Sequence, residues 1–293
     1  MELFLAQLLN GISIGSIYAL VALGYTMVYG IVKLINFAHG DVIMVGAYVV
    51  YFLVRHMGLP FLPAVLLAML TCAILGVAMD RIAYKPLRKA TRLSALITAI
   101  GVSLFLQNSF MVMMGSSPRP FPAMQAPGHV NIFGNVNASN LTIITIVTAI
   151  AMMILLQIIV KKTRVGKAMR AVSEDSGAAS LMGINVNVTI AITFAIGSAL
   201  AAVGSALYAS TFPLADPFMG MMLGLKAFVA AVVGGIGIIP GAMLGGFLLG
   251  IAESLTNAYI SSQLSDAVVF GMLIIILLFK PAGLLGKSAG EKV

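Results

Sequence analysis

The sequence predicts an all-α membrane protein, a polytopic bundle of transmembrane helices. Six segments of 20 residues or more carry no charged side chain: 3–32, 57–79, 93–114, 141–160, 188–209 and 227–252. A helix of about 20 apolar residues matches the hydrocarbon core of a bilayer. The composition agrees, because 60% of the residues are hydrophobic, 9% are charged and the mean hydropathy is +1.08. Soluble domains carry about 25% charged residues, so we interpret residues 1–293 as a single transmembrane domain.

The basic residues predict the sidedness of this domain. Of the 17 Lys and Arg residues, 14 are Lys33 or lie in 81–92, in 161–170 or in the tail from Lys280. The positive-inside bias places these segments in the cytoplasm, the N-terminus outside and the C-terminus inside. The pI of about 9.7 then reflects topology, and we expect no binding to nucleic acid. The proline-rich segment 115–140 is expected to form an ordered external loop.

Taken in order, the apolar runs cross the membrane in alternate directions, beginning with 3–32 from outside to inside. The run 42–54 has only 13 residues, too few to span alone, so it is expected to borrow from 34–41. Gly and Pro residues at 234–241 break the run 227–252, which predicts two short helices that meet in a turn. The run 267–279 returns to the basic tail. The total is nine crossings, or seven and a re-entrant hairpin.

The two interrupted segments are the candidates for a translocation path. Gly40 and Gly241 each precede an apolar helix with small residues, and paired interruptions in two halves are typical of inverted-repeat transporters. Alternatively, these glycines only permit close packing of helices, as small-xxx-small spacing does. The path candidates are Asn36, His39, Gly40, Gly234, Gly235, Gly237 and Pro240. For His39 and Asp41 a hydrogen-bonded turn is favoured over a proton relay.

Two ionisable residues, Lys226 and Glu253, flank the interrupted run 227–252. A charge within the bilayer is costly and usually functional, so the two side chains could pair or face a cavity. We favour the alternative that both lie at interfaces and snorkel towards water.

The cytoplasmic loop 161–187 contains a predicted amphipathic helix. Ser173 is a suitable N-cap, and Glu174 and Asp175 suit the first turn. Gly183 is a suitable end, and the apolar face comprises Ala178, Ala179, Leu181 and Met182. Such a face needs a partner surface, so the loop is expected to dock another protein; a helix lying on the membrane surface is the alternative.

This loop also carries a resemblance to a known family. Its pattern is Gly166-x-Ala168-x-Arg170-Ala171-x-x-Glu174-Asp175-x-x-Ala178-Ala179-x-x-x-Gly183-Ile184, which resembles the coupling segment of importer-type ABC permeases. Further stretches resemble the branched-chain amino acid permeases, the LivH-type subunits, at 10–20, 24–30, 35–40, 83–88, 226–228, 234–242 and 281–286.

The resemblance implies a subunit of an importer in the bacterial inner membrane, surrounded by lipid. Its partners would be a second homologous permease, two cytoplasmic ATPases that bind ATP and Mg²⁺, and a periplasmic substrate-binding protein. The ATPase-coupling residues would be Gly166, Arg170, Glu174, Asp175, Ala178, Ala179, Leu181 and Gly183. Some relatives carry amides or urea, which leaves these substrates as alternatives to Leu, Ile and Val.

We expect no enzymatic activity and no cofactor or metal bound by the chain itself. The tail 283–288 resembles a phosphate-binding loop, but Pro281 stands where its first glycine belongs and no strand precedes it. Cys72 is expected to be an inert packing residue. There are two alternative functions. One is an ion-coupled secondary transporter, for which Glu253 is the only candidate for the ion site, and the other is a passive channel. Neither function requires a coupling segment.

Overall fold

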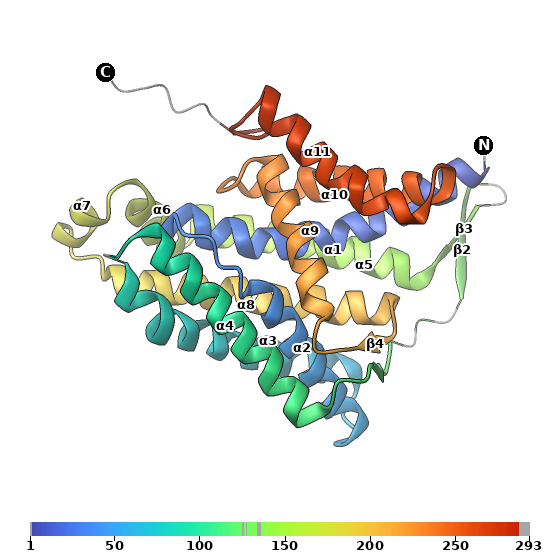
Figure 1. The fold of residues 1–293 in the computed structure, drawn as a ribbon, viewed down its shortest axis with the longest axis horizontal. Helices are drawn as coiled ribbons and strands as arrows, with labels where there is room; N and C mark the ends of the chain where they lie inside the picture. Colours follow the sequence, from blue (N-terminus) through green and yellow to red (C-terminus); the bar gives the residue numbers. More distant parts are fainter. Residues whose placement is uncertain (1, 89, 125, 127, 134–135, 287–293) are drawn as a thin grey trace.

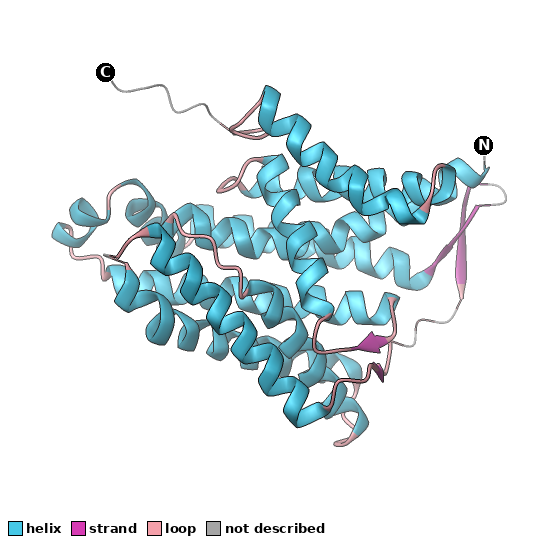
Figure 2. Ribbon diagram, in the orientation of Figure 1, coloured by secondary structure: helices cyan, strands magenta, loops and turns pink. Residues whose placement is uncertain are grey.

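Helices make up nearly all of the chain, and the short strands gather at one end of the bundle (Figure 2). The computed structural model describes all residues except 1, 89, 125, 127, 134–135 and 287–293. The N-terminus and the β2–β3 hairpin lie at the end of the bundle opposite α6 and α7 (Figure 1). The predicted cytoplasmic loop and the predicted external loop are therefore on opposite sides.

The part of the chain that the structure describes contains nine apolar helices that form the bundle. They are α1 (Glu2–Val32), α2 (His39–Arg55), α3 (Phe61–Met79), α4 (Arg92–Met114), α5 (Asn140–Lys162), α8 (Val186–Thr211), α9 (Met219–Gly234), α10 (Ile239–Tyr259) and α11 (Ser265–Phe279). A π-helix, η1 (Asp80–Tyr84), and a 3₁₀ turn, η2 (Lys85–Leu87), extend α3, and a second 3₁₀ turn, η3 (Ser262–Leu264), precedes α11. All but α2 and α9 are long and apolar enough to cross a bilayer, α3 together with η1 and η2, and α11 together with η3.

The remaining elements lie outside the bundle. At one end α6 (Arg164–Glu174) and α7 (Ser176–Leu181) form the loop between α5 and α8. At the other end β1 (Arg119–Pro120) pairs with β4 (Leu214–Ala215), and β2 (His129–Phe133) pairs with β3 (Val136–Ser139). The described part of 115–139 contains no helix, as its prolines predicted.

Local signals explain where several helices begin and end. Ser139 accepts a hydrogen bond from the Leu141 amide and caps α5, and Asn185 accepts one from the Val188 amide and caps α8. Gly115, at φ +86°, ends α4. The predicted break in 227–252 is confirmed, because α9 and α10 meet at the turn 235–238. Since α9 already starts at Met219, however, Lys226 lies inside a helix rather than at its edge.

The helices form an inverted repeat. Helix α1 packs along α10, and α8 packs in the same way along α3; α2 contacts α8 as α9 contacts α1. Helices α1 and α8 contact each other and run in opposite directions (Figure 1). They are also the most buried spans, at 89% and 78% of their apolar windows, against 28% or less for α3, α4, α5 and α11. The repeat therefore places α1 and α8 at the centre of the bundle, while α3, α4, α5 and α11 lie towards its surroundings.

Glycines permit the closest of these contacts. A Cβ atom on Gly15 of α1 would lie 2.8 Å from the carbonyl oxygen of Gly246 in α10, so the backbones touch as in other small-xxx-small pairs. The expected correspondence of Gly40 with Gly241 in the two halves is wrong: Gly40, in the first turn of α2, contacts Gly220, at the start of α9. Gly241 instead packs on Gly234 within the α9–α10 pair, because in the repeat α9, not α10, corresponds to α2.

Candidate functional site

A cavity of about 340 Å³ lies where the two short helices begin. The first turns of α2 and α9 meet there, with Gly40 against Gly220, and α4 closes one side. Most of its wall is apolar and aromatic, and includes Phe37, Leu104, Phe218, Met221 and Phe228. We call it the central cavity. Non-helical backbone within a membrane is tolerated where it lines a cavity or is buried in protein. Residues 36–38 before α2 meet that condition, because Phe37 lines the cavity and Asn36 and Ala38 are buried.

A polar cluster of three residues interrupts the apolar wall of the central cavity. Asp41 of α2 accepts a hydrogen bond of 2.7 Å from the Gln107 side-chain amide of α4, and Gln107 also contacts the Ser103 hydroxyl at 3.2 Å. Asp41 is 2% exposed and Gln107 7%. The sequence reasoning missed Gln107 and Ser103. Their signal was available, since two polar residues four positions apart share one face of an otherwise apolar helix.

Three of the predicted path residues gather around this cavity. Gly40 lines it. His39 is buried behind it, edge-on to the Tyr25 ring at 4.7 Å between centroids, and its Nε2 atom finds no hydrogen-bond partner among the described residues. Asn36 is buried as well and accepts a 2.6 Å hydrogen bond from the Tyr84 hydroxyl of η1. His39 and Asn36 therefore support the cavity without lining it.

The other predicted path residues, Gly234, Gly235, Gly237 and Pro240, lie elsewhere. They form the turn between α9 and α10, which packs on the segment after α11: the Leu285 amide donates to the Gly234 carbonyl at 3.0 Å. Gly235 has φ +111°, and a Cβ atom there would lie 2.8 Å from the Gly286 amide. Gly237 borders a small cavity of about 90 Å³ together with Arg170 and Ser173 of α6. The turn thus contacts the coupling segment rather than the central cavity.

A charged cluster joins four helices on the other side of α9. The Lys226 ammonium lies 2.7 Å from Glu253 Oε1 of α10 and 2.7 Å from Asp266 Oδ1 of α11. The Tyr18 hydroxyl of α1 donates to Glu253 Oε2 at 2.7 Å. Lys226 and Glu253 are 9% and 8% exposed. The snorkelling interpretation of these two residues is therefore wrong, because the first turns of α9 pack against α10 and α11 and hold Lys226 away from water.

The loop 161–187 forms two helices, α6 and α7, where the sequence predicted one. The predicted N-cap at Ser173 is wrong: Ser173 lies in the last turn of α6 and donates to the Arg170 carbonyl at 2.8 Å. Asp175 caps α7 instead, accepting from the amides of Gly177 at 2.7 Å and Ala178 at 3.0 Å. Gly183, at φ +81°, follows the end of α7 as predicted.

The apolar residues of α7 divide between two surroundings. Leu181 is 90% exposed and Met182 82%, and Ala178 is exposed beside them; we call these three residues the α7 tip. Ala179 is 4% exposed and belongs to a cluster with Tyr84 and Phe194 of its own chain. The expectation that Ala179 is buried in a partner is therefore wrong, because this side chain already packs inside the bundle.

The residues at the start of α6 fix its position against α5. Thr163 caps the helix by accepting from the Gly166 amide at 3.1 Å. A side chain at Gly166 would collide with the carbonyl groups of Ile159 and Val160. Arg170 donates to the Lys161 carbonyl at 3.4 Å, and Glu174 is exposed at the end of α6.

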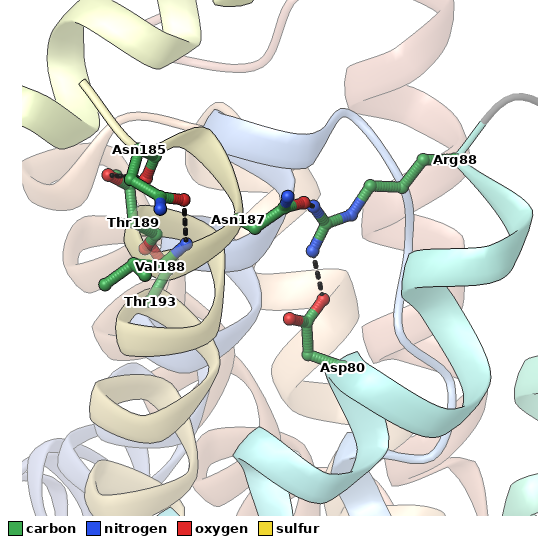
Figure 3. A network of polar contacts seen from close by, with 7 residues as sticks. All are labelled: Asp80, Arg88, Asn185, Asn187, Val188, Thr189 and Thr193. Atoms are coloured by element: carbon green, nitrogen blue, oxygen red, sulfur yellow. Dashed lines mark hydrogen bonds and ion pairs between the residues drawn. The ribbon is translucent and has the colours of Figure 1, made fainter. Parts of the chain in front are cut away.

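Arg88 joins the extension of α3 to the start of α8 (Figure 3). Its guanidinium donates to Asp80 Oδ1 of η1 at 2.6 Å and to Asn187 Oδ1, at the start of α8, at 2.7 Å. Tyr84 of the same π-helix bonds to Asn36, next to the central cavity. Short π-helical turns inside α-helices are frequent at functional sites. A continuous set of contacts thus runs from Asn187, at the end of the loop 161–187, to the cavity. Nothing in the sequence indicated which acidic residue would pair with Arg88.

Comparisons with known proteins agree with this architecture. Residues 7–277 match the family described as the branched-chain amino acid transport system permease component. The chain is 45% identical to the high-affinity branched-chain amino acid transport system permease protein BraD of Pseudomonas aeruginosa, with 99% of this chain and 98% of the relative aligned. It is also 45% identical to the LivH permease protein of Escherichia coli K12 over the same shares, and 29% identical to a probable LivH permease protein of Methanocaldococcus jannaschii over 92% and 89%.

Proposed function

Because the chain belongs to the family of branched-chain amino acid transport system permease components, we propose that it is the permease subunit of an ATP-driven importer for Leu, Ile and Val. The observation that carries this proposal is the family match over 7–277, supported by relatives aligned over nearly their whole length. The chain is a multi-pass inner-membrane protein, with nine apolar helices in its described part.

The central cavity is the proposed point of passage. Its apolar wall suits aliphatic side chains, and its single polar cluster suits the charged end of an amino acid. Along this wall the Phe228 ring contacts the Tyr25 ring edge-on and the Phe37 ring at a tilt, with centroids 5.9 and 5.8 Å apart. The chain would form one side of the path, and the second permease subunit would close it.

Energy for transport is proposed to come from partner subunits. Two cytoplasmic ATPases would bind ATP and Mg²⁺ and dock at the α7 tip, while a periplasmic binding protein would deliver the substrate at the opposite end. An exposed apolar tip at the predicted cytoplasmic end is what such a dock requires. The alternative of ion-coupled transport loses its candidate site, because Glu253 is already bonded to Lys226 and Tyr18.

Uptake by the complete reconstituted importer tests this function. The chain is assembled in proteoliposomes with its partner permease, ATPases and binding protein, and uptake of radiolabelled Leu, Ile and Val is measured with and without ATP. We expect uptake only when ATP is present on the side of the membrane that carries the ATPases. A sodium or proton gradient should not change the rate of uptake. Selective uptake of acetamide or urea, or uptake driven by an ion gradient alone, would contradict the proposal.

A further inference from the structure

We propose that Asp41 binds the α-ammonium group of the amino acid as it passes through the central cavity. This assignment rests on the proposed function and adds a specificity-determining residue to it. Asp41 lines the cavity wall, and its carboxylate is oriented by Gln107 of the facing helix.

The first argument is the charge balance around Asp41. Buried carboxylates in membrane spans are normally paired with a cation. Asp80 and Glu253 follow this rule, with ion-pair distances of 2.6 and 2.7 Å. Among the described residues, Asp41 takes part in no ion pair, although it is only 2% exposed. Its hydrogen-bond partners, Gln107 and Ser103, are neutral.

The N-terminus of α2 offsets only part of this charge. Asp41 lies in the first turn of α2, where the helix dipole is equivalent to about half a positive charge. A carboxylate stabilised in this way still attracts a cation that enters the cavity. The ammonium group of an amino acid supplies that cation, and leaves again with the substrate.

The second argument is the distribution of polar and apolar surface. The polar cluster of Ser103, Gln107 and Asp41 occupies one part of the wall, and aromatic and aliphatic side chains form the rest. Such a cavity fits a molecule with one charged end and an aliphatic body.

Neutralising Asp41 in the complete reconstituted importer tests the assignment. Asp41→Asn keeps the shape and an acceptor for Gln107 but removes the charge. We expect ATP-driven leucine uptake to fall at least roughly tenfold. The reason is that losing a hydrogen bond to a charged group weakens binding by about this factor or more. Assembly and the stimulation of ATP hydrolysis by the loaded binding protein should persist. Asp41→Glu, which restores the charge, should recover much of the uptake.

Two further variants keep the test decisive. Gln107→Lys places a tethered ammonium beside Asp41, so it should form an internal ion pair, assemble stably and abolish uptake. Asp266→Asn is the control, because it removes a half-exposed acid outside the cavity while Lys226 keeps Glu253. Wild-type uptake by Asp41→Asn or Gln107→Lys would overturn the assignment. If the wild-type complex itself fails to import leucine with ATP, the proposed function fails instead.

Discussion

Buried charges in this bundle have two kinds of surroundings. We assign a structural role to charges with partners of opposite charge, and a role in transport to the charge that faces a cavity. Lys226 is paired with the buried Glu253 and with the half-exposed Asp266 from two neighbouring helices, so each buried charge of this cluster has a partner of opposite charge. Asp41 faces a cavity and has only neutral side-chain partners among the described residues. Inside a bilayer an uncompensated charge is costly. The Lys226 cluster is therefore a structural ion-pair cluster, and Asp41 is a site for a cation that passes through the cavity.

Breaking the ion pair between Lys226 and Glu253 should destabilise the protein without altering the central cavity. Lys226→Met leaves Glu253 buried with Tyr18 alone, and the loss of one partner of a buried ion pair costs about 3–5 kcal/mol. The double variant Lys226→Met/Glu253→Gln removes both charges and should regain most of that loss. Thermal unfolding of the purified protein in detergent measures both. Equal unfolding temperatures for the single and double variants would show that the pair is not coupled.

The short helices owe their positions to contacts between elements that are distant in sequence. The sequence predicted the breaks before α2 and between α9 and α10, because Gly and Pro act locally. It could not predict that α2 and α9 begin side by side, since that contact depends on the repeat bringing Gly40 onto Gly220. The cap of α7 was likewise assigned to Ser173 instead of Asp175. Both residue types are good N-caps, and only packing against the bundle decides between them.

The α7 tip also depends on contacts beyond its own sequence, because its apolar side chains are exposed in this chain. We expect Leu181→Asp to lower copurification of the ATPase and ATP-driven uptake at least roughly tenfold, since a charge in an apolar groove would be buried unpaired. Insertion and folding should be normal, because Leu181 is 90% exposed. Ala179→Glu should instead impair folding, since its side chain is packed inside the bundle.

The matched control for the tip is Met57→Asp, which places the same charge on a side chain that is 61% exposed between α2 and α3, at the far end of the bundle. It should retain the ATPase and transport normally. A Leu181→Asp complex that retains the ATPase and transports at the wild-type rate would exclude the α7 tip as the dock.

At the scale of the whole molecule, the order of apolar runs and basic gaps was enough to predict the helical bundle and the two loops at its opposite ends. These features depend on the thickness and charge asymmetry of the membrane, which act on each segment separately. The central cavity depends on contacts across the inverted repeat. Asn36, His39 and Gly40 were placed near it by the predicted interruption before the run 42–54, whereas Asp41, Ser103 and Gln107 acquire their role only when α2 meets α4.

The sidedness of the whole molecule can be tested with single cysteines. Ser117 and Leu181 are both exposed and lie in the two loops placed at opposite ends of the bundle. In intact cells with a permeabilised outer membrane, a membrane-impermeant maleimide should label Ser117→Cys and leave Leu181→Cys unlabelled, with the reverse in inside-out vesicles. The native Cys72 is fully buried and should contribute little background. Labelling of both positions from the same side would contradict an odd number of crossings between them, and with it the opposed directions of α1 and α8 on which the repeat depends.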